Sequence, residues 1–273
     1  MAEPAIQGLM QGRRGLVMGV ANDHSIAWGI AQQLHRHGAE LAFTYQGEAF
    51  GKRVKPLAGS VGSKLLLPCD VEDASTVRAV FDTLKSEWGT IDFVVHAIAF
   101  SDKNELKGKY AGTTRDNFIR TMVVSCFSFT EVARHAAALM PGGGSLLTLT
   151  YGGSMRVVPN YNVMGVAKAA LESSVRYLAA DYGPQGIRVN AISAGPMRTL
   201  AGAGIGDARN MFNFQQTHAP LRRPITLEEV GGAGLYLLSP LSGGVTGEIH
   251  SVDSGYNIIS MPRLEELKNG NAA

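Results

Sequence analysis

A tyrosine and a lysine seven positions apart are the side chains of this sequence best suited to act together chemically. Tyr161 and Lys168 stand at the start of a long helical pattern, and seven residues make two helical turns. Both side chains are therefore expected on one helix face, in one pocket. A cation roughly 5 Å from a phenol, at an effective dielectric of about 20, favours nearby negative charge by about 3 kcal/mol. That energy is large enough to change a reaction rate, although an isolated pair would also fit an aromatic staple beside an exposed lysine.

A loop of small residues near the N-terminus is suited to binding a diphosphate. It runs from Gly19 to Ala31, leaving a predicted strand and entering a helical pattern. The free N–H groups and the dipole at a helix N-terminus favour anions, so we expect contacts from Gly19, Ser25 and Ile26. The loop lacks the G-x-G-x-x-G pattern of many dinucleotide sites, so by itself it also fits an ordinary strand-to-helix turn.

Two further strand ends carry residues expected to contact adenosine. Gln46 stands where many dinucleotide-binding folds place an acid on the ribose, while Glu40 begins the same strand and so lies at the wrong end of the sheet. No base directly follows Gln46, which favours NADH over NADPH. On the next strand, Asp70 could accept the adenine amino group and Val71 could pack on the ring; Asp70 could instead cap the helix that follows.

The exits of the fourth and sixth predicted strands are suited to the nicotinamide half of the cofactor. Small apolar residues around Ile98 permit close backbone approach, whereas the neighbouring His96 is expected to be a packed core residue. Gly195-Pro196 forces a turn, after which N–H and hydroxyl groups can meet a carboxamide and a diphosphate. The residues that follow this turn are Met197, Arg198, Thr199, Leu200 and Ala201.

Seven short apolar runs alternate with segments of helical period, which is typical of a parallel sheet covered on both faces. The sequence therefore predicts an α/β fold, a Rossmann-like doubly wound parallel seven-stranded sheet flanked by helices on both faces. We expect one domain over residues 1–273, with a substrate-covering lid at about 198–220. The predicted strands are 15–19, 40–45, 64–70, 91–99, 145–150, 187–193 and 247–253, and the main predicted helical segments are 26–38, 74–89, 115–140 and 166–183. Asp73 is the predicted N-cap of the second of these segments, and Gly38, Gly89 and Gly183 are predicted C-terminal stops.

Composition narrows the class of protein further. The chain has 273 residues, 45% hydrophobic and 18% charged, with a net charge of +2, which excludes a coiled coil, collagen or a disordered chain. The interspersed charges predict neither nucleic acid nor an anionic membrane surface as a partner. Cys69 and Cys126 form no metal-binding pattern, so we expect no metal site and a reducing compartment. Without a signal segment or an apolar run of about 20 residues, a cytoplasmic location is expected.

The order of these motifs resembles the short-chain dehydrogenase/reductase superfamily, and specifically its NADH-dependent enoyl-acyl-carrier-protein reductase branch. The resemblance covers nearly the whole chain. It is carried by the loop GVANDHSIAWGIA, the six residues between Tyr161 and Lys168, the extra Tyr151 ten positions earlier, and ISAGPMRTLAGAGI. Ketoreductases of the superfamily instead have three residues between tyrosine and lysine and an active-site serine. Ala97, Ala99, Gly206 and Ala208 depart from the branch's pattern, which bears on chain-length preference and carrier-protein contacts.

The resemblance implies hydride transfer from NADH to the β-carbon of a trans-2-enoyl thioester carried on acyl carrier protein. Tyr161 would donate a hydrogen bond to the enolate oxygen, Lys168 would hold the nicotinamide ribose, and Tyr151 would border the thioester. Ile98 and the segment 197–201 would bind the nicotinamide half of the cofactor. Ser101 would touch the substrate, and Ile205 and Met211 in the lid would cover its acyl chain. The resemblance also suggests a homotetramer, consistent with long helices that are apolar on more than one face.

Two other functions are compatible with the same fold. A ketoreductase or alcohol dehydrogenase would act on a 3-oxoacyl thioester or an alcohol, but the spacing of Tyr161 and Lys168 favours the enoyl branch. A nucleotide-sensing protein would bind the cofactor without turnover, and the intact pair argues against it. Arg209, Arg222 and Arg223 could contact the carrier protein or form a solvated surface.

Overall fold

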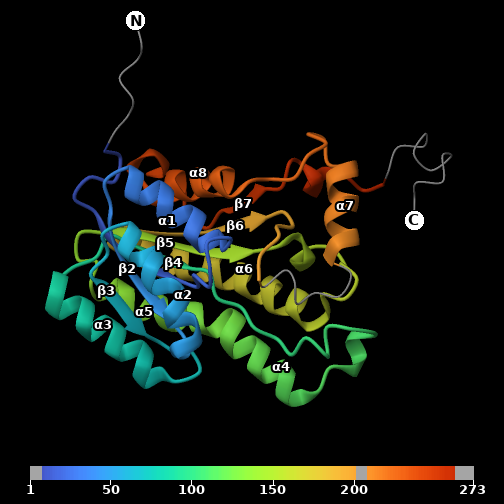
Figure 1. Cartoon of the computed structure of the whole chain (residues 1–273), viewed down its shortest axis with the longest axis horizontal. Coiled ribbons are helices and arrows are strands. Elements are labelled where there is room, and N and C mark those ends of the chain that lie inside the picture. The colour runs from blue at the N-terminus through green and yellow to red at the C-terminus, as the bar shows by residue number, and fades with distance from the viewer. Residues whose placement is uncertain (1–7, 201–207, 262–273) are drawn as a thin grey trace, which may run out of the picture.

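The computed structural model describes residues 8–200 and 208–261, which form a central sheet between two layers of helices (Figure 1). The strands are β1 Arg14–Met18, β2 Glu40–Tyr45, β3 Leu65–Pro68, β4 Phe93–His96, β5 Gly144–Thr150, β6 Ile187–Ala194 and β7 Ile249–Val252. The helices are α1 Ile26–Arg36, α2 Gly47–Ser60, α3 Ala74–Trp88, α4 Arg115–Met122, α5 Ser128–Ala137, α6 Asn162–Tyr182, α7 Ala208–His218 and α8 Leu227–Leu238.

All seven strands are parallel, in the order β3-β2-β1-β4-β5-β6-β7. The predicted fold class is confirmed. The strand order reverses between β1 and β4, and ligands of open α/β sheets bind beside the carboxyl ends of the strands at such a point. The turns after these two strands, at Gly19 and Ala97, are therefore where the fold places a binding crevice.

Apolar side chains on the two faces of the sheet form two separate cores. One joins the sheet to α3, α5 and α6, and contains Phe81, Phe129 and Leu171. The other joins it to α1, α2 and α8, and contains Ile30, Val54 and Val230. Because both faces are buried, the central strands are continuous apolar runs such as Phe93-Val94-Val95, all fully buried.

Local signals place most of the predicted helix ends correctly. The Asp73 carboxylate accepts the Ser75 N–H, which makes Asp73 the predicted N-cap of α3. Gly38 and Gly89 follow α1 and α3 with positive φ angles of 94° and 74°. Gly183 does follow α6, but its φ of −53° is right-handed, and the chain makes a further short turn before the left-handed Gly186.

Two features of the helices differ from the sequence prediction. The segment 115–140 is divided by a π-helical turn at Val123–Phe127 between α4 and α5. Helix α8, which packs on α1, was not among the predicted helices, although Thr226 and Glu229 form a capping box at its start. Within 8–200 and 208–261, no helix is long and apolar enough to cross a membrane.

Candidate active site

Gly19 and the chain leaving β4 touch at the carboxyl edge of the sheet. Gly19 has a φ of 93°, and a Cβ at this position would lie 2.0 Å from the Ala97 carbonyl oxygen. Only glycine fits both the backbone conformation and the space. The β1 and β4 exits are thus in backbone contact, and the floor of the crevice carries no side chain at Gly19.

The loop after Gly19 is held in shape by the Ser25 hydroxyl. Its Oγ accepts the N–H groups of Ala21 and Asn22 at 3.0 and 3.1 Å. Ser25 is the N-cap of α1 but makes no capping hydrogen bond with its side chain. The first turn of α1, starting at Ile26, therefore has N–H groups that could donate hydrogen bonds to a bound anion such as a diphosphate.

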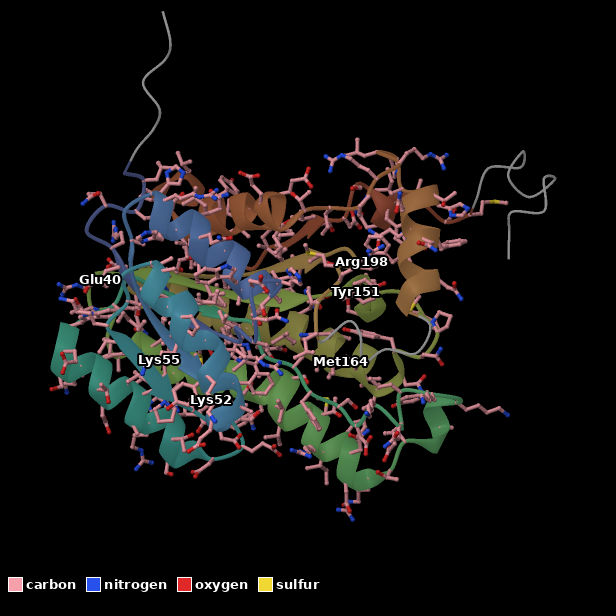
Figure 2. All side chains as sticks on the ribbon, in the orientation of Figure 1. Glu40, Lys52, Lys55, Tyr151, Met164 and Arg198 are labelled. Atoms are coloured by element: carbon pink, nitrogen blue, oxygen red, sulfur yellow. The ribbon has the colours of Figure 1, made fainter. Side chains whose placement is uncertain are left out.

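Gln46 and Asp70 meet across the ends of β2 and β3. The Gln46 Nε2 donates to Asp70 Oδ2 at 3.0 Å, and Asp70 Oδ1 accepts the Glu72 N–H. Since Asp73 caps α3, Asp70 is not that cap; its carboxylate shapes the turn and presents negative charge beside Gln46. Val71 is buried next to it. Glu40 lies at the other end of β2, paired with Arg14 and far from Tyr151 (Figure 2).

His96 is a buried core residue, as predicted. Its ring nitrogens lie 3.3 Å from Thr148 Oγ1 and 2.9 Å from Ser128 Oγ. Burial, with a smaller contribution from the Lys168 charge, lowers the pKa of His96 to about 3. The imidazole is therefore neutral and is not poised to exchange protons near neutral pH. Ile98, two residues on, is half-buried against the α3/α5/α6 core.

Tyr151 and Tyr161 form an edge-to-face pair beyond the end of β5. Their ring centroids are 5.1 Å apart at an interplanar angle of 78°. Burial is the largest cause raising the pKa of Tyr161 above its ordinary value, and burial raises the pKa of Tyr151 to about 12. Both phenols therefore remain protonated, and each can donate a hydrogen bond.

Lys168 is buried on α6, beside the end of β5. Its Nζ donates to the Leu149 carbonyl oxygen at 2.7 Å. Burial lowers the pKa of Lys168 to about 8, opposed by Cys126 and Glu172. The ammonium is still the main form at neutral pH. Tyr161 is the N-cap of α6, and the helix itself begins at Asn162. The sequence prediction of two full helical turns between Tyr161 and Lys168 therefore placed the start of the helix one residue too early.

Sequence reasoning missed the acidic partner in this buried cluster. Glu172 is 4% exposed, and its Oε1 accepts the Thr150 hydroxyl at 2.6 Å. The sequence does indicate this partner, because Glu172 lies four residues after Lys168 and therefore on the same helix face. It contributes a negative charge that helps to keep the Lys168 ammonium protonated.

The expected substrate contact Ser101 belongs to a polar network. The Thr121 hydroxyl donates to Ser101 Oγ at 3.0 Å, and Asn117 Nδ2 donates to the same oxygen at 3.2 Å. The network attaches the chain leaving β4 to α4. Whether Ser101 also contacts a substrate stays a prediction.

The segment after β6 comes next to α7. A Cβ at Gly195 would lie 2.4 Å from Gln215 Nε2, so α7 packs against the Gly195-Pro196 turn. The exposed Arg198 stacks its guanidinium over the Phe212 ring, 5.0 Å from the ring centroid. Met197, Thr199 and Met211 are half-buried and Leu200 is exposed. Ala201 and Ile205, the other expected contacts here, lie outside the described residues.

The three arginines considered for the carrier protein have different surroundings. Arg223 forms an ion pair with Glu229 at 2.5 Å, and Arg222 donates to the Thr217 carbonyl oxygen. The side chain of Arg209 is outside the described part of the chain. Arg223 is thus engaged within its own chain, which weakens its assignment to a partner.

This fold and site together define a nucleotide-binding oxidoreductase of the short-chain dehydrogenase/reductase type. Gly19 meets the Ala97 backbone at the reversal of strand order, the half-buried Tyr151 and the buried Tyr161 pair beyond β5, and the buried Lys168 donates to the end of β5. Among the described residues, no group of three or more His, Cys, Asp or Glu side chains could hold a metal ion.

Comparison with known proteins assigns the particular family. The family model described as enoyl-(acyl carrier protein) reductase matches residues 19–257. The chain is 73% identical to an NADH-dependent enoyl-[acyl-carrier-protein] reductase of Rhizobium meliloti, over 98% of this chain and 100% of the relative. The crystal structure of FabI from Candidatus Liberibacter asiaticus has a TM-score of 0.92 at 63% identity, covering 94% of this chain and 99% of that one. An Anaplasma phagocytophilum enoyl reductase solved in complex with NAD has a TM-score of 0.91 at 57% identity, covering 94% and 98%. The chain belongs to the enoyl-acyl-carrier-protein reductase family.

Substituting Gly19 tests the crevice. Gly19→Ala places a methyl group against the Ala97 backbone in a left-handed conformation, so the β1 and β4 exits must separate. We expect NADH affinity to fall by about tenfold or more, because a shift of about 1.4 kcal/mol is tenfold in binding. Calorimetric titration with NADH measures this directly. Gly59→Ala, where a Cβ has open space at negative φ, is the control and should bind like wild type. Equal affinity of both variants would contradict the placement of the crevice.

Proposed function

We propose that this chain is an NADH-dependent enoyl-acyl-carrier-protein reductase that uses Tyr151, Tyr161 and Lys168 at its active site. The reaction reduces the trans-2 double bond of an enoyl thioester and is the last step of the fatty-acid elongation cycle. The observation that carries the residue assignment is the edge-to-face pair of Tyr151 and the buried Tyr161, with the buried Lys168 bonded to the end of the strand that leads to Tyr151, in a chain of this family. The enzyme is an oxidoreductase acting on CH–CH groups.

The residues around the crevice fit the cofactor. NADH, when bound, supplies the hydride. The first turn of α1 at Ser25 and Ile26 would hold the diphosphate beside Gly19, and Asp70 and Val71 would bind the adenine. Ile98 and the segment 197–201 would hold the nicotinamide half. The carboxylate of Asp70 beside Gln46 would repel an additional phosphate, which favours NADH over NADPH.

The chain's own side chains would stabilise the charge that forms on the substrate. Tyr161, kept protonated by burial, would donate a hydrogen bond to the thioester oxygen as it becomes an enolate. Lys168 would hold the ribose hydroxyls and supply positive potential. Tyr151 would border the thioester, and Ser101, Ile205 and Met211 would contact the rest of the substrate.

The direction of hydride delivery can be tested by isotope labelling. NADH deuterated at the reactive nicotinamide C4 position, incubated with the chain and a trans-2-enoyl thioester, should give a saturated acyl thioester with deuterium at the β-carbon. Mass spectrometry of the product reads this out. A 3-hydroxyacyl product from the matching 3-oxoacyl thioester, with no saturated acyl product, would contradict the proposed reaction.

Activity should depend on pH through Lys168. We expect the rate to be constant near neutral pH and to fall as the pH rises through about 8, where the ammonium is lost. The stability of the apoprotein should change in the opposite direction. Because the folded pKa of about 8 is below the unfolded value of 10.5, the unfolded chain binds more protons at Lys168, and stability rises with pH between about 8 and 9. Above about pH 9 the raised pKa values of Cys69, Tyr151 and Tyr161 oppose this rise. Initial rates and urea unfolding at matched pH values measure the two trends, and a rate unchanged well above pH 8 would contradict the role of Lys168.

Three broader properties belong to the same proposal. Residues 1–273 form one Rossmann domain in which residues 198–220 cover the substrate.

The chain assembles as a homotetramer, supported by large apolar side chains exposed on or beside α4 and α6, namely Ile119, Phe127 and Val166. It acts in the cytoplasm, supported by two buried cysteines that form no disulfide. Its protein partner is the acyl carrier protein.

A further inference from the structure

The loop that carries Tyr151 is a compact turn attached on one side to the start of α6. The Tyr151 carbonyl oxygen accepts the Ser154 N–H at 3.0 Å, and the Gly152 carbonyl oxygen accepts the Arg156 N–H at 3.1 Å. Gly153 packs so closely on Tyr161 that a Cβ there would lie 2.4 Å from the Tyr161 ring. Displacing any part of this turn therefore displaces Tyr151 relative to Tyr161.

Arg156 attaches the other side of this turn to the segment after β7. Its Nη1 donates to the Ile259 carbonyl oxygen at 2.8 Å, and its Nη2 donates to the Asn257 carbonyl oxygen. The planar guanidinium thus bridges two backbone acceptors, a geometry that a lysine ammonium does not reproduce. Residues about a hundred positions apart in the chain are joined by this one side chain.

The accepting segment is itself a rigid turn, organised by Asp253. The Asp253 carboxylate accepts the Asn257 N–H at 2.7 Å, the Asn257 side-chain amide at 3.1 Å and the Gly255 N–H at 3.0 Å. These bonds hold Asn257, and the Ile259 N–H donates to the Tyr256 carbonyl oxygen at 3.1 Å, so both residues whose carbonyl groups accept from Arg156 belong to the same hydrogen-bonded turn. We call residues 253–259 the Asp253 turn.

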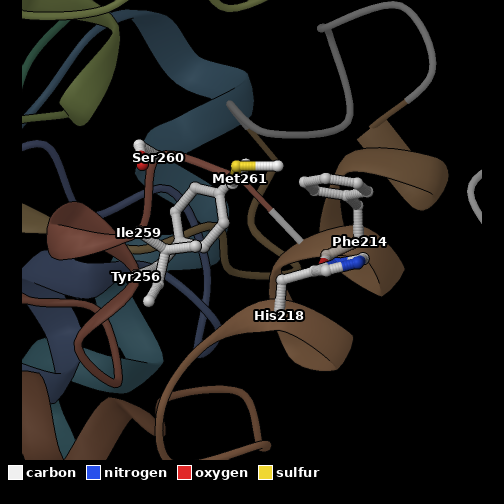
Figure 3. A pocket seen from close by; sticks show the side chains of 6 residues that line it. All are labelled: Phe214, His218, Tyr256, Ile259, Ser260 and Met261. Atoms are coloured by element: carbon white, nitrogen blue, oxygen red, sulfur yellow. The ribbon is translucent and has the colours of Figure 1, made fainter. Parts of the chain in front are cut away.

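The opposite side of the Asp253 turn packs on α7 and the chain that follows it. Gln215 Nε2 donates to the Asp253 carbonyl oxygen at 3.1 Å, and the Leu221 N–H donates to the Ser254 carbonyl oxygen. The ring of Tyr256 stands edge-on to Phe214 at 6.4 Å, and Phe214 stacks on His218 (Figure 3). The Asp253 turn therefore lies between α7 and the turn that carries Tyr151.

We propose that Arg156 is a positioning residue for the reaction, because it fixes the Tyr151 turn against the Asp253 turn and so sets where Tyr151 stands relative to Tyr161 and α7. This inference rests on the proposed function, in which Tyr151 borders the thioester. The electrostatics agree with the geometry: burial is the largest cause that raises the pKa of Tyr151, and Tyr256 and Asp253 add to it, as groups that lie near Tyr151. Arg156 itself touches neither substrate nor cofactor in this account.

The proposal predicts a loss of turnover that depends on Tyr151. Arg156→Ala should lower kcat for a trans-2-enoyl thioester by about tenfold, because small displacements of a positioned group cost large factors in rate. The Kd for NADH should stay within about twofold of wild type. In a Tyr151→Phe background the same substitution should change kcat by less than about twofold, because residues that act as a unit are not additive.

The experiment compares wild type, Arg156→Ala, Tyr151→Phe and the double variant by steady-state kinetics, NADH titration and thermal melting. Arg78→Ala, an exposed arginine on α3, is the matched control and should behave as wild type. Arg156→Lys keeps the positive charge and serves as the test variant if Arg156→Ala does not express. Its kcat should still be lower than that of the wild type. Full activity of Arg156→Lys would overturn the two-carbonyl bridge.

The outcomes separate this inference from the function on which it rests. Wild-type turnover of the enoyl thioester with a tenfold, Tyr151-dependent loss in Arg156→Ala supports both. Three results would overturn the positioning role alone, provided that the wild type turns over the enoyl thioester. Arg156→Ala could cause equal losses of kcat in the wild-type and Tyr151→Phe backgrounds, or no loss, or a loss of kcat accompanied by weaker NADH binding and a lower melting temperature. Absence of enoyl turnover in the wild type overturns the proposed function and the inference together.

Discussion

Tyr161→Phe is expected to lower kcat for enoyl reduction by about a hundredfold or more while leaving NADH binding unchanged. The substitution removes one hydroxyl from a buried ring and preserves its edge-to-face contact with Tyr151. Losing one donor to a developing oxyanion commonly costs about a hundred- to a thousandfold in rate. Steady-state rates of NADH consumption, with NADH affinity measured separately, give the result.

Tyr177→Phe is the matched control for this prediction. Tyr177 lies on the same helix, α6, but is 74% exposed, so removing its hydroxyl should leave the rate unchanged. A fall of less than about threefold in Tyr161→Phe, with the protein folded and NADH bound, would mean that the reaction does not use this phenol.

Lys168→Met is expected to cause the other large loss, about a hundredfold in kcat/KM. Methionine keeps most of the apolar stem but removes a charge that, at roughly 5 Å and an effective dielectric of about 20, is worth about 3 kcal/mol to nearby negative charge. About 1.4 kcal/mol corresponds to tenfold in rate, so the loss spans about two orders of magnitude. Because Lys168 is also expected to hold the ribose hydroxyls, NADH affinity should fall as well. This weaker binding distinguishes Lys168→Met from Tyr161→Phe.

The pH dependence provides a second check on Lys168. The fall in rate above about pH 8 should disappear in Lys168→Met, because the titrating ammonium is gone. Lys64→Met, at an exposed position before β3, should keep both the wild-type rate and its pH profile. If the variant at position 168 keeps the alkaline fall, another group titrates and the assignment to Lys168 is wrong.

The fold could be predicted from the sequence because its signals are local. Parallel strands buried on both faces must be apolar throughout, so runs such as Phe93-Val94-Val95 are visible without a structure. Capping residues such as Asp73 are equally local. The division of 115–140 by a π-helical turn was not predictable, since the turn packs on α6 together with α4 and α5, and no break in the apolar pattern marks it.

The sequence indicates which residues belong to the candidate site, but not the hydrogen bonds that join them to distant parts of the chain. The positions of Tyr161 and Lys168 follow from spacing, and Gly19 follows from the strand-to-helix turn. The hydrogen bond between Gln46 and Asp70 depends on β2 lying beside β3, which the sequence does not state. The bridge from Arg156 to the segment near residue 259 joins distant parts of the chain, and only tertiary structure brings them together.

The most direct test of the proposed reaction is to measure NADH oxidation by wild type and Tyr161→Phe with a trans-2-octenoyl thioester and, in parallel, with the matching 3-oxoacyl thioester. We expect rapid oxidation with the enoyl substrate alone, reduced about a hundredfold or more by the substitution. Oxidation only with the 3-oxoacyl substrate would make the chain a ketoreductase. NADH binding without turnover of either substrate would contradict a catalytic role and leave a nucleotide-binding protein.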